Sequence, residues 1–79
     1  MNEPLLLEDE LNEYFTFVKF EECLGIRFEV YLDDYGQSYH LAWVNPNTRE
    51  KEKWCCGTYN NYKEEIEDIA NYLRGVKVV

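Results

Sequence analysis

The chain has 79 residues and a net charge of -8. This length predicts a single domain over residues 1–79 and leaves little room for a deep catalytic cleft between two lobes. The pI near 4.5 argues against direct binding to nucleic acid or to an anionic membrane, because both attract lysine and arginine. No stretch approaches the ~20 apolar residues of a membrane span, so we expect a cytoplasmic protein.

The first predicted element is a helix over residues 4–14. Pro4 suits the first turn of a helix, and the acids near the start match the positive end of the helix dipole. Leu7, Leu11 and Tyr14 fall on one side of this helix by their spacing. We therefore expect it to pack on the sheet that follows.

Four strands are expected next. Aromatic and β-branched residues predict a first strand over residues 15–20, with a turn over 21–25. Residues 26–33 alternate apolar and polar side chains and form the clearest period-two strand of the sequence.

Short connections join the remaining strands. Gly36 suits a hairpin loop over residues 34–37, and Pro46 suits a turn over 45–48. These turns predict a third strand over 38–44 and a fourth over 49–59. Three consecutive short connections imply an antiparallel meander.

A second helix is expected over residues 62–74, capped by Asn60 or Asn61 and ended by Gly75. Its apolar stripe has helical spacing and comprises Tyr62, Ile66, Ile69 and Leu73. Residues 76–79 are expected as a short edge strand or a tail.

The predicted architecture is α+β: a four-stranded antiparallel sheet with an N-terminal and a C-terminal helix packed on one face. The other face is then left to water or to a partner. The aromatic residues expected in the core or partly buried are Phe17, Phe20, Phe28, Trp43 and Trp54. The tyrosines expected outside the core, where tyrosine favours interfaces, are Tyr31, Tyr35, Tyr39 and Tyr59.

The negative charge is concentrated in the first part of the chain. Residues 1–48 carry ten acids and two bases, whereas residues 49–79 carry six of each. Such asymmetry produces a directional field that suits a basic partner. The alternative is that the acids serve solubility alone.

Closely spaced carboxylates can imitate the phosphates of a nucleic-acid duplex and so occupy a basic channel of another protein. Glu29, Tyr31 and Asp33 alternate along one strand and are expected to share a contact surface. Two further acids, Glu21 and Glu22, fall in the first turn. The residues predicted to bind the partner are Glu8, Asp9, Glu10, Glu13, Glu29, Tyr31, Asp33, Asp34 and Tyr35.

Catalytic and metal sites are not expected. The lone His40 falls within a predicted strand, where it is more often structural than a base. A zinc site would have to use His40 with Cys23, Cys55 and Cys56, and these lack the paired C-x2-C spacing. We expect reduced, packed cysteines, no cofactor and no enzymatic activity.

In size, acidity and α+β pattern, with acids at Glu8-Asp9-Glu10 and Asp33-Asp34, the chain resembles small phage-encoded anti-CRISPR and other anti-defence inhibitor proteins. It also resembles the immunity proteins, antitoxins that neutralise nuclease toxins. The first resemblance implies a non-enzymatic DNA mimic that acts in the host cytoplasm. Such a protein would occlude the basic nucleic-acid-binding surface of a nuclease or guide-RNA effector complex.

The competing interpretation is a structural or adaptor module, monomeric or homodimeric, whose acidity serves only solubility. A homodimer would form through an edge strand or through the aromatic face of the sheet. Charge-driven binding weakens with salt, whereas an apolar dimer does not, so the two interpretations differ in a measurable property.

Overall fold

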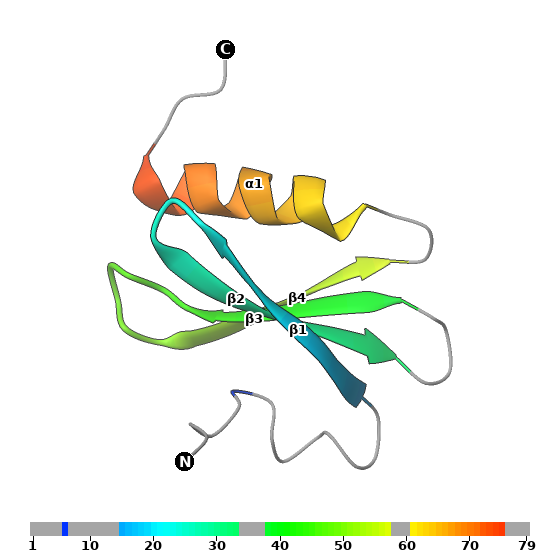
Figure 1. Cartoon of the computed structure of the whole chain (residues 1–79). Helices are drawn as coiled ribbons and strands as arrows, with labels where there is room; N and C mark the ends of the chain where they lie inside the picture. Colours follow the sequence, from blue (N-terminus) through cyan, green and yellow to red (C-terminus); the bar gives the residue numbers. More distant parts are fainter. Residues whose placement is uncertain (1–5, 7–14, 34–37, 58–60, 76–79) are drawn as a thin grey trace.

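The computed structural model describes residues 6, 15–33, 38–57 and 61–75. Its elements are β1 (Phe15–Cys23), β2 (Ile26–Asp33), β3 (Tyr39–Val44), β4 (Lys51–Gly57) and α1 (Tyr62–Arg74). The strands form one antiparallel sheet in the order β1-β2-β3-β4, and α1 lies across one face of it (Figure 1). The predicted four-stranded meander with a C-terminal helix is confirmed.

The first hairpin turn is shorter than predicted. β1 continues through Glu21 and Glu22, which pair with residues of β2, so that only Leu24 and Gly25 lie between the strands. Both have positive φ, 52° and 77°, as a type I′ turn requires at its two central positions. The prediction of a turn over 21–25 was wrong because two polar residues in an edge strand resemble a loop.

β4 also begins later than predicted. The Asn45 side-chain oxygen accepts hydrogen bonds from the backbone N–H groups of Asn47 (2.8 Å) and Thr48 (3.3 Å). The Arg49 N–H then donates to the Asn45 carbonyl (2.8 Å), and Arg49 takes a positive φ of 66°. Glu50 still belongs to this connection, so the strand starts at Lys51.

α1 follows the predicted pattern closely. The Asn61 side chain caps it by accepting from the Lys63 N–H, and Gly75 ends it with a left-handed φ of 72°. Of the predicted stripe, Ile66 and Leu73 are buried, while Tyr62 and Ile69 are partly buried against the same core. The core between α1 and the sheet comprises Ile26, Phe28, Val30, Leu41, Trp43, Cys56, Ile66, Ala70 and Leu73.

Four aromatic residues differ from the expected burial, among them Tyr31, which was expected outside the core and is fully buried. Phe20 and Trp54 are 45% and 52% exposed, although they were expected in or near the core. Tyr39, expected outside, is partly buried and its ring lies 4.7 Å from that of Tyr62. Trp54 lies on β4, which ends the sheet, so its ring has neighbours on fewer sides than a central residue has.

The predicted N-terminal helix and the tail over 76–79 lie outside the described residues, apart from Leu6. That residue packs against the buried pair Tyr31 and Ala42, whose side chains alternate with those that face α1. Within the described ranges, no helix has the length and apolar composition needed to cross a membrane.

Replacing Gly75 tests the cap of α1. A Cβ at this position would meet no atom within 4 Å, so Gly75→Ala adds only the strain of a left-handed φ. We expect a loss of about 1 kcal/mol in the free energy of unfolding, measured by urea denaturation. Gly75→Asn, which tolerates this conformation better, should lose less. Equal stability of all three proteins would contradict the observed cap.

Candidate protein interface

The strand residues predicted as a contact surface are largely buried. Glu29 is 2% exposed and Tyr31 is fully buried, on the face of the sheet opposite α1. The Tyr31 hydroxyl donates a hydrogen bond to Oε1 of Glu29, and the backbone N–H of Leu6 donates to the same oxygen (2.8 Å). Glu29 and Tyr31, which were expected to lie on an exposed contact surface, are therefore buried by groups of the chain itself.

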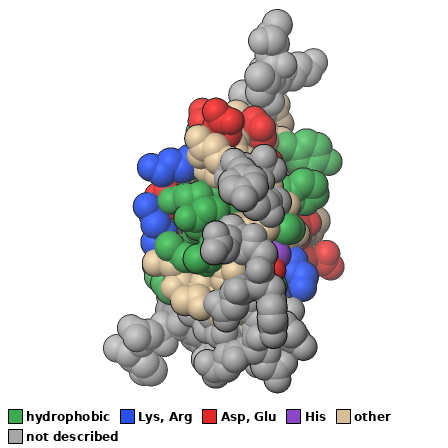
Figure 2. Space-filling model, turned by 90° about the vertical axis from the view of Figure 1, so that its right-hand side faces the viewer, with side chains coloured by type: hydrophobic (Ala, Val, Ile, Leu, Met, Phe, Trp, Pro, Cys, Tyr) green, Lys and Arg blue, Asp and Glu red, His purple; other side chains and the backbone are tan. Residues whose placement is uncertain are grey.

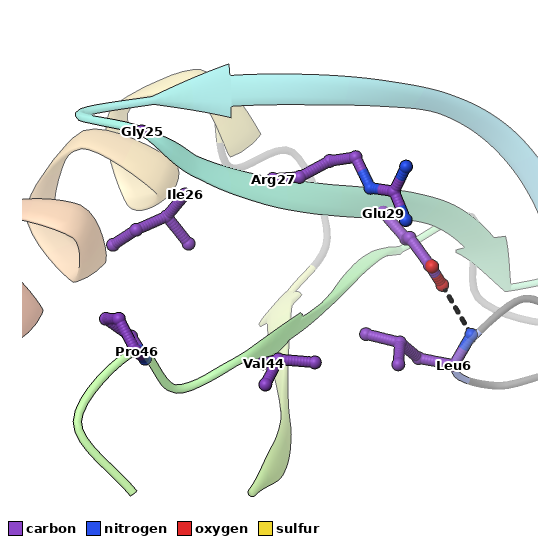
Figure 3. A pocket seen from close by; sticks show the side chains of 7 residues that line it. All are labelled: Leu6, Gly25, Ile26, Arg27, Glu29, Val44 and Pro46. Atoms are coloured by element: carbon purple, nitrogen blue, oxygen red, sulfur yellow. Dashed lines mark hydrogen bonds between the residues drawn. The ribbon is translucent and has the colours of Figure 1, made fainter. Parts of the chain in front are cut away.

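The Glu29 carboxylate also borders a small pocket of about 250 Å³ on that face (Figure 3). Arg27 and Glu29 of β2 extend along the strand, and Leu6 approaches from the opposite side with its N–H directed at the carboxylate. The Arg27 guanidinium lies 4.8 Å from the centre of the Phe20 ring, a cation–π contact. Glu29 and Arg27 are thus both in contact with groups of this chain.

Asp33 lies with His40 and Cys55 at the other end of the same face. Oδ2 of Asp33 is 3.4 Å from Nε2 of His40, and Sγ of Cys55 is 4.0 Å from that same nitrogen. In a cysteine–histidine–acid relay the acid holds one ring nitrogen while the nucleophile uses the other. Here both groups approach Nε2, so the geometry differs from that of a relay.

The remaining predicted acids are dispersed or lie outside the described residues. Glu21 pairs with Lys19 at 3.5 Å, and Glu22 is exposed on β1. The predicted partner-binding residues outside the described ranges are Glu8, Asp9, Glu10, Glu13, Asp34 and Tyr35. Of the predicted set, the residues within the described ranges are Glu29, Tyr31 and Asp33, which share one strand, and the first two are buried.

None of the three cysteines forms a disulfide, and of the three it is Cys55 that approaches His40. Cys55 is exposed on the His40 side of β4, whereas Cys56 is buried in the core beneath α1. Neighbouring residues of a strand point to opposite faces, which is why the adjacent thiols separate. Among the described side chains, no group of three or more His, Cys, Asp or Glu could hold a metal ion.

A groove between β4 and α1 is the most distinctive surface of the described part of the chain. It has a volume of about 430 Å³ and combines exposed aromatic rings with carboxylates. Trp54 is 52% exposed and Tyr72 is 83% exposed at its rim. The residues that line it are Trp43, Asn45, Glu52, Trp54, Glu65, Asp68, Ile69, Tyr72 and Leu73.

On the face that Figure 2 shows, both acidic and basic side chains are present. Figure 2 shows acids near the height of α1 and basic side chains on both sides of a central hydrophobic region. The groove differs because three acids line it and no lysine or arginine does. We name it the acidic aromatic groove.

Sequence reasoning missed this groove. It takes Glu52 and Trp54 from β4 and Glu65, Asp68 and Tyr72 from α1, all from the part of the chain where acids and bases balance. One signal was present in the sequence: Glu65, Asp68 and Tyr72 have the three- and four-residue spacing of one helix side, next to the apolar stripe.

Thiol reactivity tests the separation of the two adjacent cysteines. Burial, followed by the charges of Glu65 and Cys55, raises the pKa of Cys56 to about 11, so its thiol stays protonated at neutral pH. A thiolate is the reactive form, and Cys55 is exposed. We expect iodoacetamide at pH 8 to label Cys55 much faster than Cys56, measured by mass spectrometry of Cys55→Ser and Cys56→Ser variants.

In urea the difference in rate should disappear, because both thiols are then exposed. Equal labelling of Cys55 and Cys56 in the folded protein would contradict the burial of Cys56.

The chain matches no protein-family model, no curated protein and no solved structure. No residue role can therefore be transferred from a relative. The functional argument depends on the chemistry of this chain's own side chains.

Proposed function

We propose that this protein is a non-enzymatic acidic inhibitor that binds a basic nucleic-acid-binding protein and occludes its nucleic-acid site. The observation that carries the proposal is the net charge of -8, all of which arises from residues 1–48. A field of this kind accelerates encounter with a cationic surface and repels nucleic acid itself. The target would be a nuclease or a guide-RNA effector complex.

The distribution of charge in the chain supports this proposal. The described residues include ten acids and seven bases, so most of the surplus negative charge belongs to residues outside them. Glu8, Asp9, Glu10 and Glu13 remain the proposed mimics of phosphate. Because Glu29 and Tyr31 are buried, they are no longer part of the proposed contact surface.

Exposed aromatic side chains supply the second part of the proposal. Charge determines how fast two proteins meet, whereas desolvated aromatic anchors slow their separation. Trp54 and Tyr72 are exposed aromatic residues that lie beside acids, so they could supply such anchors. They replace Tyr31 as the proposed anchors.

A homodimeric adaptor is the second candidate, and the same exposed rings favour it. Trp54 and Tyr72 lie on one side of the molecule, next to the strand that ends the sheet. In a homodimer these rings would be covered by a second copy, and association would depend little on salt.

A salt series distinguishes the two candidates. We expect proteins captured from a bacterial lysate by the immobilised chain to be nucleic-acid-binding proteins. Their affinity should fall steeply between about 0.01 and 0.1 M salt, over which the screening length shortens from ~30 to ~10 Å. Added chain should displace duplex DNA or guide RNA from the captured protein in a competition assay.

The matched control compares two double charge reversals. Asp9→Lys with Glu10→Lys should weaken capture by at least about tenfold, whereas Glu64→Lys with Glu67→Lys, on the exposed side of α1, should weaken it less. Equal effects of the two pairs, or capture without displacement of nucleic acid, would contradict the proposed inhibitor. Salt-independent self-association would favour the adaptor.

A further inference from the structure

We propose that the acidic aromatic groove binds a cationic segment of another protein, with an arginine or lysine side chain lying across Trp54 and Tyr72 and paired with Glu65 and Asp68. This inference rests on the proposed function for the two aromatic anchors, Trp54 and Tyr72. It deepens that function by naming the cation that they and the neighbouring acids bind, and it does not require that the partner bind nucleic acid.

The groove is built from two elements whose side-chain spacing brings its residues together. Glu65, Asp68 and Tyr72 succeed one another at intervals of three and four residues along α1, so they form one flank. Glu52 and Trp54 alternate along β4 and point to the same side of the sheet, which forms the other flank. Between the flanks, the buried Trp43 and Leu73 form an apolar floor.

The carboxylates of the groove have no cationic partner among the residues that the structure describes. None of the ion pairs within the described ranges involves Glu52, Glu65 or Asp68. Glu52 is held by neutral donors instead: Nε1 of Trp43 donates to it at 2.9 Å, and Nδ2 of Asn45 donates at 3.2 Å and 3.3 Å. The floor of the groove therefore fixes the position of one negative charge without neutralising it.

The charge of Glu65, which lines the groove, also reaches the core beside it. It helps to raise the pKa of Cys56 on β4, after the larger effect of burial. A cation between the two flanks would therefore meet negative potential from α1 as well as from Glu52. Exposed carboxylates alone bind cations weakly, and the aromatic rings supply the second attraction.

The combination of groups selects an organic cation. The faces of tryptophan and tyrosine attract ammonium and guanidinium groups, and guanidinium also stacks on them. The described side chains form no cluster suited to a metal ion, so these acids are not arranged as metal ligands. A volume of about 430 Å³ accommodates a long basic side chain together with part of its backbone.

The probe for this site is the peptide acetyl-Gly-Arg-Gly-Arg-Gly-amide. Its matched control replaces both arginines by citrulline, which keeps the shape and removes the charge. We expect the arginine peptide to shift the indole N–H signal of Trp54 in a ¹⁵N–¹H spectrum, assigned with Trp54→Phe, and the citrulline peptide to bind at least about threefold more weakly.

Variants of α1 separate the groove from the net charge. Asp68→Asn and Tyr72→Ala should each lower the affinity for the arginine peptide by about two- to fivefold, measured by calorimetry. Glu67→Gln removes the same charge from an exposed residue on the flank of α1 near Glu21 and Glu22, and it should change affinity much less. An equal effect of Asp68→Asn and Glu67→Gln, or equal binding of both peptides, would overturn the inference.

The peptide experiment and the capture experiment can refute the two proposals separately. If the arginine peptide binds in the groove while the Asp9 and Glu10 reversals leave capture unchanged, the inference stands and the proposed inhibitor does not. If capture depends on Asp9 and Glu10 while the arginine peptide leaves the Trp54 signal unshifted, the groove inference is refuted and the inhibitor proposal stands.

Discussion

The carboxylate of Glu29 is buried by hydrogen bonds within the chain, and this burial removes part of one face of the sheet from contact with a partner. Two donors converge on one carboxylate oxygen of Glu29: the hydroxyl of Tyr31, which is two residues away on the same strand, and the backbone N–H of Leu6, which is 23 residues away. A buried carboxylate without such donors would be costly, so these bonds and the burial of the pair depend on each other. Buried residues lie on both faces of the sheet, beneath α1 on one side and around Tyr31 and Ala42 on the other.

The acidic aromatic groove lies on the side of the molecule where the sheet ends. β4 lies at one end of the strand order, and α1 lies beside it without covering Trp54. The acidic aromatic groove is the result, since Glu52 on the strand and Glu65 and Asp68 on the helix face a common space. An acidic protein can thus combine long-range attraction from its charge with short-range contacts at one groove.

The fold was largely predictable from local patterns, whereas the site was not. Alternation over residues 26–33 and the caps of α1 depend on neighbours in sequence, and the structure confirms both. Alternation does not predict whether a polar residue of a strand is buried by tertiary contacts. Glu29 is buried by contacts that include Leu6, which is 23 residues away in the sequence. Counting charges along the sequence likewise did not predict the groove. Acids and bases balance in number over residues 49–79, but the fold of α1 and β4 places three of the acids around one groove that no lysine or arginine lines.

A double-mutant cycle on Glu29 and Tyr31 tests the central claim most directly, since it measures whether the two side chains stabilise each other. Tyr31→Phe removes one donor from a buried carboxylate and should lower the free energy of unfolding by about 1–3 kcal/mol. Glu29→Met combined with Tyr31→Phe should lose clearly less than the two single losses together, by at least about 0.5 kcal/mol. Additive losses, measured by urea unfolding, would contradict a sheet face closed by this pair.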